Sequence, residues 1–161
     1  MARSSASPQG ATRGTEPRVS PVRITVEPRA SAADVAAVQD GLRAFNVARI
    51  GEPHEEPVQL FLRGEDDRVV GGLLGHVRWR WLYVAKLWID DAHRGAGYGT
   101  ALLAAAESHA QTRDCIGAYL DTFEYQARPF YEKLGYELFG TLEGYPPGFR
   151  QYHLAKRFLQ P

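Results

Sequence analysis

Hydrophobic and polar positions follow two different periods along the chain, and together they predict a mixed α/β domain. Near the N-terminus, apolar and polar residues alternate over Val22–Glu27, which predicts a strand that ends at Pro28. Ser31 is a good N-cap residue, and from there the spacing becomes that of a helix, which we expect to run to about Arg49. The apolar residues that define this spacing are Val35, Val38, Leu42, Phe45 and Val47.

The rest of the chain continues the pattern of strands and helices. We expect helices at residues 98–113, which are rich in Ala and Leu, and at residues 127–134, which end at Gly135. A hairpin near Arg80 joins two long β-rich segments. The expected strands cover residues 58–63, 69–79, 81–89, 116–122, 136–142 and 149–158. The predicted fold class is α/β, with a central mixed sheet of about seven strands flanked by helices.

Residues 1–21 differ in composition from everything that follows. They are rich in Ser, Ala, Pro, Gly and Arg and contain almost no large apolar side chain, so they cannot bury enough surface to offset the entropy of ordering. The segment lacks the apolar core of a secretory signal, and its Arg and Ser bias comes without the amphipathic period of a transit peptide. We expect a disordered extension at residues 1–21, one folded domain at residues 22–161 and a cytoplasmic location.

Charge and composition narrow the classes of function. The 161 residues include 19 basic and 19 acidic ones, and this balance argues against binding to nucleic acid. No apolar run approaches the roughly 18 residues of a membrane span. Cys115 is the single cysteine, so no disulfide forms within the chain. None of the five histidines pairs with Cys or another His at metal-ligand spacing, so we expect no metal.

The segment Arg94-Gly95-Ala96-Gly97-Tyr98-Gly99 lies between a predicted buried strand and a predicted helix. Glycines allow a tight turn that brings backbone N–H groups close to phosphate oxygens, and the helix N-terminus favours the same anion. Arg94 adds a charge-assisted contact. The spacing is neither that of a P-loop nor that of a dinucleotide-binding turn. Taken alone, the segment therefore predicts an anion cradle or a flexible turn.

A second segment, Ala127-Arg128-Pro129-Phe130-Tyr131-Glu132-Lys133-Leu134-Gly135-Tyr136, follows a predicted strand about 30 residues later. Together the two segments resemble the GNAT superfamily of acetyltransferases, and the resemblance covers about residues 22–158. The first is similar to its pyrophosphate loop and the second to its "A-x-x-Phe-Tyr-Glu-Lys-x-Gly-Phe/Tyr" helix. The resemblance implies the GNAT acyl-CoA N-acyltransferase fold, with acetyl-CoA as cosubstrate and an amine as acceptor.

The resemblance also implies where acetyl-CoA binds. The cofactor would lie between the strands at residues 82–89 and 116–122, which are the two middle parallel strands. Backbone groups of Leu87, Trp88 and Ile89 would pair with the pantetheine arm. The pyrophosphate would contact Arg94, Gly95, Ala96, Gly97, Tyr98, Gly99 and Thr100. Phe130 would line the pantetheine, and Lys133 would lie near the nucleotide end.

Transfer in such enzymes is direct: a neutral amine attacks the thioester, and the leaving thiolate takes a proton. Tyr131 matches the family's general acid, and a phenol with a pKa near 10 remains protonated at neutral pH; the alternative is a tyrosine packed at a helix end.

Relatives with a glutamate base would place it near Tyr83, where this sequence has no carboxylate. Glu124 is the candidate base, with Asp121 as a second one, and either would act through water; each is otherwise a surface carboxylate or a helix cap. Catalysis through an acyl-Cys115 lacks a recognisable His partner.

The acceptor is expected opposite the cofactor, near the loop after the first helix and the hairpin at Arg80. Acidic and aromatic walls there suit a cationic small molecule such as a polyamine or an amino sugar, and an aminoglycoside-type antibiotic such as kasugamycin is one example, which would make the enzyme a resistance factor. Solvated loop charges and core tryptophans are the alternative explanation. The candidate acceptor-binding residues are Glu52, Glu55, Trp79, Trp81, Tyr83, Asp121 and Tyr145.

Two other functions stay open at this point. A protein acceptor, at a lysine or an N-terminus, would need an open peptide groove. A cofactor-binding sensor without turnover would explain the missing carboxylate near Tyr83, although Tyr131 argues for an enzyme. A homodimer is also expected, because exposed hairpin aromatics or the C-terminal strand pair offer a surface for it.

Overall fold

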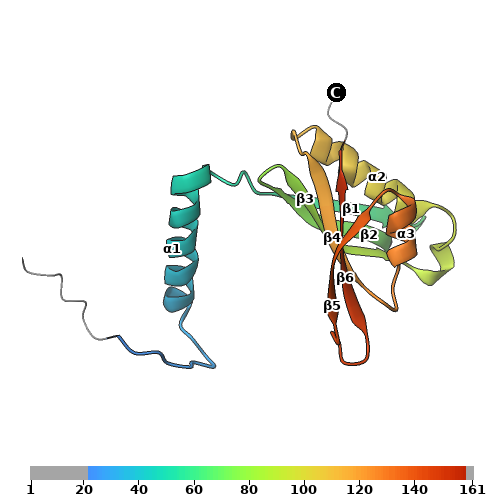
Figure 1. Cartoon of the computed structure of the whole chain (residues 1–161). Coiled ribbons are helices and arrows are strands. Elements are labelled where there is room, and N and C mark those ends of the chain that lie inside the picture. The colour runs from blue at the N-terminus through green and yellow to red at the C-terminus, as the bar shows by residue number, and fades with distance from the viewer. Residues whose placement is uncertain (1–21, 159–161) are drawn as a thin grey trace, which may run out of the picture. The chain divides into compact units, whose positions relative to one another are not determined.

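The computed structural model describes residues 22–158, so the extension predicted at residues 1–21 lies outside the described part (Figure 1). The chain divides into two units, Met1–Ala44 and Phe45–Pro161. The boundary falls inside helix α1 (Ala32–Ile50). No side chain of this helix is buried. Its predicted N-cap is confirmed, because the hydroxyl of Ser31 accepts a hydrogen bond from the amide of Asp34 at 3.0 Å.

The strand predicted at Val22–Glu27 is wrong. Residues 22–27 have no regular structure, and Val22, Ile24 and Val26 are 88–99% exposed. A strand needs a neighbouring edge to pair with its backbone, and alternation over six residues does not supply one. The sheet consequently has six strands instead of about seven.

The mixed sheet is confirmed, and its strands run in the order β1-β2-β3-β4-β6-β5. Strands β3 and β4 are parallel, and every other neighbouring pair is antiparallel. The strands are β1 (Glu56–Arg63), β2 (Val69–Arg78), β3 (Trp81–Ile89), β4 (Gly117–Phe123), β5 (Glu137–Glu143) and β6 (Arg150–Arg157). The helices are the short 3-10 turn η1 (Asp91–His93), α2 (Tyr98–Gln111) and α3 (Arg128–Lys133). The hairpin turn predicted at Arg80 is also confirmed, with positive φ angles at Trp79 and Arg80.

The two faces of the sheet differ in what covers them. Leu82 and Val84 of β3 and Leu120 of β4 are buried in one core with Leu103 of α2 and Tyr131 of α3. Helices α2 and α3 therefore cover one face, as the ribbon also shows (Figure 1). Because side chains alternate along a strand, the residues between these core positions point to the opposite face.

Strands β3 and β4 pair over only four positions, from Trp81↔Gly117 to Val84↔Leu120. Beyond Val84, β3 stays paired with β2 but has no ladder partner on the side of β4. A bulge between Leu74 and Gly75 accompanies this divergence on the β2 side. The middle of the sheet is therefore split along the C-terminal half of β3.

Candidate active site

The glycine loop sits at the open end of this split. Gly95 and Gly97 have φ angles of 78° and 84°, in the left-handed region that favours glycine, and Gly97 is the N-cap of α2. A Cβ at either position would meet nothing within 4 Å, so the loop borders open space. The first amides of α2 have no partner within the helix, and such amides at a helix N-terminus favour an anion.

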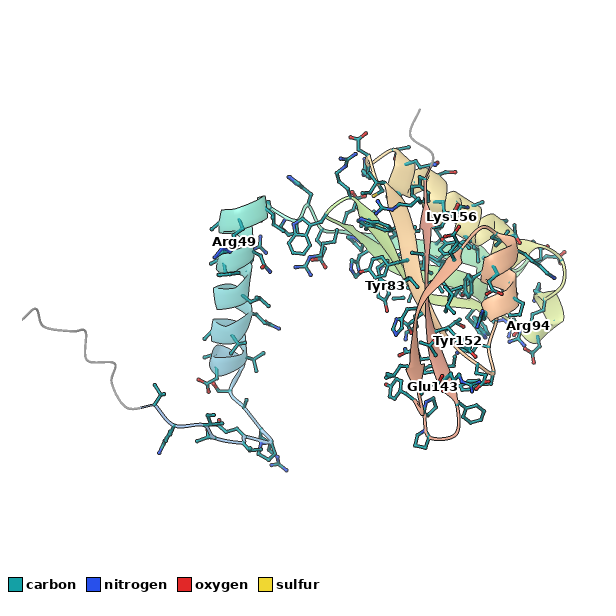
Figure 2. All side chains as sticks on the ribbon, viewed as in Figure 1. Arg49, Tyr83, Arg94, Glu143, Tyr152 and Lys156 are labelled. Atoms are coloured by element: carbon teal, nitrogen blue, oxygen red, sulfur yellow. The ribbon has the colours of Figure 1, made fainter. Side chains whose placement is uncertain are left out.

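Arg94 anchors the loop to the end of β3. Its Nη1 lies 2.7 Å from a carboxylate oxygen of Asp91, and its Nε donates to the carbonyl of Ile89 at 3.0 Å (Figure 2). The guanidinium thus joins η1 to the strand that precedes the loop. These contacts assign Arg94 a part in shaping the loop, in addition to the phosphate contact expected from the sequence.

Helix α3 brings the second sequence motif against the first. A Cβ added to Gly99 would lie 3.4 Å from the ring of Phe130, so α2 and α3 approach closely at that position. The next residue, Tyr131, is buried and packs edge-on against Phe130 and Tyr136. Burial, and secondly the charge of Asp121, raises the pKa of the Tyr131 phenol to about 12. The phenol is therefore protonated throughout the neutral range.

On the opposite face, aromatic rings surround a carboxylate. The rings of Tyr83 and Tyr119 stack with centroids 4.9 Å apart, and Trp81 meets Tyr119 edge-on. The hydroxyl of Tyr83 donates to Oδ1 of Asp121 at 2.8 Å. Burial, followed by this hydrogen bond, raises the pKa of Tyr83 to about 12. Tyr83 is labelled in Figure 2. The strand of Tyr83 carries no carboxylate of its own, and β4 supplies one from a position 38 residues later.

Glu124, the other candidate base, has a cationic partner. Its Oε1 lies 2.9 Å from Nη1 of Arg150, and the same guanidinium donates to Glu143 at 2.8 Å. The backbone amide of Glu124 also donates to the carbonyl of Arg150. Glu124 therefore connects the end of β4 to the β5–β6 hairpin.

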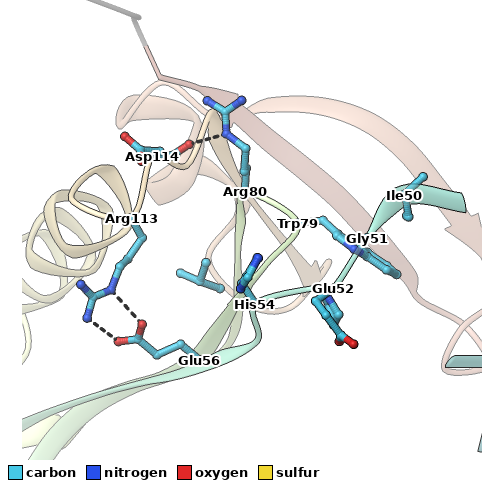
Figure 3. A pocket seen from close by; sticks show the side chains of 11 residues that line it. Ile50, Gly51, Glu52, His54, Glu56, Trp79, Arg80, Arg113 and Asp114 are labelled. Atoms are coloured by element: carbon cyan, nitrogen blue, oxygen red, sulfur yellow. Dashed lines mark hydrogen bonds and ion pairs between the residues drawn. The ribbon is translucent and has the colours of Figure 1, made fainter. Parts of the chain in front are cut away.

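The residues predicted around the hairpin divide between two places. Glu52 and Trp79 line a cavity of about 650 Å³ with His54, Arg80 and Arg113 (Figure 3). Glu56 closes one side of it through a double hydrogen bond to Arg113 at 2.8 and 3.0 Å, which lowers the pKa of the Glu56 carboxyl. Tyr83 and Asp121 do not line this cavity. Glu55 lies outside it too and pairs with Arg78 at 3.6 Å.

Tyr145 belongs to an aromatic cluster at the other end of the site. Its ring lies 5.9 Å from that of Phe123, the last residue of β4, which stacks on Tyr125. Phe149 meets Tyr125 edge-on at 5.1 Å. Phe123 shares its strand face with Asp121, so the cluster borders the carboxylate. Three of these rings are more than 40% exposed, and the sequence analysis missed all but Tyr145.

The sequence model of the acetyltransferase (GNAT) family matches residues 31–136. The chain belongs to this family. An acetyltransferase of Agrobacterium fabrum, Atu2258, is 41% identical over 122 residues, which cover 76% of this chain and 89% of that one. The blasticidin-S acetyltransferase of Streptomyces morookaense is 45% identical over 94 residues, or 58% of this chain and 69% of that one. A crystal structure of an Agrobacterium tumefaciens acetyltransferase superposes with a TM-score of 0.78 at 38% identity, covering 85% of this chain and all of that one.

Membership of the GNAT family makes the protein an acyl-CoA-dependent N-acetyltransferase. The family uses acetyl-CoA, and the residues present fit it: a glycine cradle for phosphates opens at the end of a strand whose backbone is unpaired on one side. Leu87, Trp88 and Ile89 lie on that unpaired stretch, and Thr100 lies in the first turn of α2. Tyr98 and Lys133 are exposed, as contacts to a nucleotide require.

Cys115 lies away from this constellation, just before β4. It is buried, and burial raises the pKa of its thiol, which disfavours the thiolate that a nucleophile needs. Among residues 22–158, no three His, Cys, Asp or Glu side chains gather closely enough to hold a metal ion. In the same part of the chain, no helix has both the length and the apolar character to cross a bilayer.

Proposed function

We propose that this GNAT enzyme moves the acetyl group of acetyl-CoA to the primary amine of a small cationic molecule of the antibiotic type. The observation that carries the proposal is the split between β3 and β4. At its apex, Val84↔Leu120, Tyr131 lies in the core on the helix-covered face, and the aromatic face with Asp121 lies opposite. A thioester and an amine can meet at such a point from opposite directions.

The comparison with blasticidin-S acetyltransferase supports the antibiotic-type acceptor. That relative is named for a small-molecule substrate, and the 94 matched residues are 45% identical. The aromatic residues on the open face add a physical reason, because stacked rings bind cations and flat groups. An aminoglycoside such as kasugamycin remains one candidate within this class.

Each group of the site has a distinct task in this reaction. Acetyl-CoA supplies the activated acetyl group. The amides around Gly97 bind the phosphates, and the unpaired edge of β3 aligns the arm that follows them. As nitrogen bonds to the carbonyl carbon and the carbon–sulfur bond breaks, the hydroxyl of Tyr131 donates its proton to the sulfur. The closed helical face excludes water, which limits hydrolysis of the thioester.

The test is release of the CoA thiol from acetyl-CoA in the presence of single amines. The panel contains blasticidin S, kasugamycin, spermidine, free lysine and lysine-containing peptides. Rapid release with one of the small cations supports the proposal. Release with peptides alone would make the enzyme a protein acetyltransferase, and tight acetyl-CoA binding without release would indicate a sensor.

A further inference from the structure

The side chain of Asp121 is fixed by neighbours on both sides. Its Oδ1 accepts from the Tyr83 hydroxyl at 2.8 Å, and its Oδ2 accepts from Nε2 of Gln151 at 2.8 Å. The three residues come from β3, β4 and β6, so three strands determine where the carboxylate points. A half-buried carboxylate held by two rigid strands keeps its position when a substrate arrives.

Both partners of Asp121 are neutral, unlike those of several other carboxylates of the described chain. Glu56, Glu107, Glu124 and Glu132 each form an ion pair with Arg or Lys. None of the ion pairs found within residues 22–158 includes Asp121. Two hydrogen bonds use only half of the roughly four acceptor positions of a carboxylate. The site thus holds a partly desolvated negative charge that a cation would neutralise.

The position of Asp121 along β4 is equally specific. It follows Leu120, the last residue that pairs with β3, so it stands at the apex of the split. It shares a face with Tyr83 and Tyr119, whose stacked rings present π-electrons beside the carboxylate. The charge of Asp121 also contributes to the raised pKa of Tyr131, so the carboxylate and the phenol interact electrostatically across the split.

We propose that Asp121 binds the protonated amine of the acceptor beside the stacked rings of Tyr83 and Tyr119 and takes its proton, while Tyr83 and Gln151 act as positioning residues. The inference rests on the proposed acetyl transfer and names its amine site. It restricts acceptors to amines that are ammonium ions at neutral pH, attached to an apolar or flat group that the rings can cover.

The proton and electron balance is complete with these groups. The ammonium gives one proton to the carboxylate of Asp121 and becomes a neutral amine. Nitrogen then forms the amide bond with the acetyl carbon, the carbon–sulfur bond breaks with its electron pair on sulfur, and Tyr131 protonates the sulfur. The second proton released by nitrogen restores the phenol of Tyr131, and Asp121 returns its proton to water.

The first test is independent of turnover and uses a pair of probes that differ in charge, 2-phenylethylamine and 2-phenylethanol. Shifts of the tyrosine ring resonances measure their binding to the full-length protein. We expect the ammonium probe to bind at least about fivefold more tightly than the alcohol, and Asp121→Asn to abolish the difference. Equal binding of the two probes to the wild-type protein, or no ring shift with either, would overturn the amine site.

The second test is kinetic and uses the amine with the highest rate in the thiol-release panel. Asp121→Asn retains an acceptor for the Tyr83 hydroxyl but removes the charge. We expect it to lower kcat/KM for the amine about 100-fold or more, with the acetyl-CoA Kd changed less than twofold. Tyr83→Phe should raise the KM of the amine about three- to tenfold. Asp66→Asn, the same change in the β1–β2 turn, controls for the loss of one carboxylate.

The outcomes separate the two proposals. If the wild-type enzyme acetylates no amine, the proposed function fails, and the probe pair still decides whether Asp121 is a cation site. If the wild-type enzyme is active and Asp121→Asn retains its kcat/KM within about threefold, the amine site is wrong while acetyl transfer stands. Glu124→Gln is expected to have the smaller effect of the two, and a reversed order would assign the proton acceptor to Glu124.

Discussion

Lys156 of β6 donates a hydrogen bond from Nζ to Oε2 of Glu107 in α2, at 2.6 Å. The hydroxyl of Tyr136, directly after α3, donates to the other oxygen of Glu107 at 2.9 Å. The network therefore joins the sheet to the two helices that carry the glycine loop and Tyr131. Only 28% of the Lys156 side chain and 14% of the Glu107 side chain are exposed.

This pair makes a prediction about stability. Lys156→Met leaves the charge of Glu107 mostly buried without its cation, and we expect the free energy of unfolding to fall by about 2–3 kcal/mol. Glu107→Gln combined with Lys156→Met should recover much of the loss, because Gln still accepts from Tyr136. Urea denaturation measures both effects. A single variant as stable as the wild type would show that the pair contributes little.

Tyr131→Phe tests the proposed general acid. We expect kcat to fall about 100-fold, because the thiolate leaves without a proton donor, while the Kd of acetyl-CoA stays within twofold. Calorimetry measures the binding, and thiol release measures the turnover. An unchanged kcat at saturating amine would reduce Tyr131 to a packing residue.

Gly97→Ala tests the anion cradle. A residue with a Cβ at φ 84° costs about 1–2 kcal/mol in the left-handed region, so the loop should rearrange and weaken acetyl-CoA binding about tenfold. Gly144→Ala is the matched control, since Gly144 has a φ of 70° in the β5–β6 loop. It should carry a comparable stability loss and leave the acetyl-CoA Kd unchanged. An equal loss of binding in both variants would show a general effect of destabilisation.

The buried phenols predict how stability depends on alkaline pH. The folded protein holds the pKa of Tyr131 at about 12, whereas the unfolded chain ionises near 10. Its contribution is therefore complete below about pH 10 and is lost as the pH rises toward 12, at up to about 1.4 kcal/mol per pH unit. Tyr131→Phe should flatten the decline of unfolding free energy between these values. A decline of the same steepness in the variant would contradict the buried, protonated phenol.

Sequence reasoning succeeded where local pattern determines structure. The glycines at 95 and 97 predicted a tight turn before a helix, and both have positive φ angles in the structure; Gly135 predicted the end of α3. These features depend on residues within one turn of each other. The prediction of a strand at Val22–Glu27 was wrong because it also relied on a local pattern. A strand needs a partner edge from a distant part of the chain, and the alternation of six residues does not show whether one is there.

The amine site depends on contacts that no local pattern reveals. Tyr83 and Asp121 are 38 residues apart and meet only because β3 and β4 pair in parallel with Tyr83 opposite Tyr119. A register shifted by one residue would have turned Asp121 into the core. The cluster of Phe123, Tyr125 and Phe149 with Tyr145 was missed similarly, because it joins the end of β4 to a distant hairpin.

The separation of β3 from β4 after Val84 also affects the thermal stability of the protein. Along the last five residues of β3, the backbone groups that point to the side where a strand is missing depend on water or on a bound molecule, apart from the Ile89 carbonyl, which accepts from Arg94. A molecule that fills this gap binds only the native chain, so it raises the melting temperature in proportion to the logarithm of its concentration. The enzyme's lifetime in a cell would then follow the supply of acetyl-CoA, and a shortage of the acetyl donor would deplete the catalyst as well as slow it.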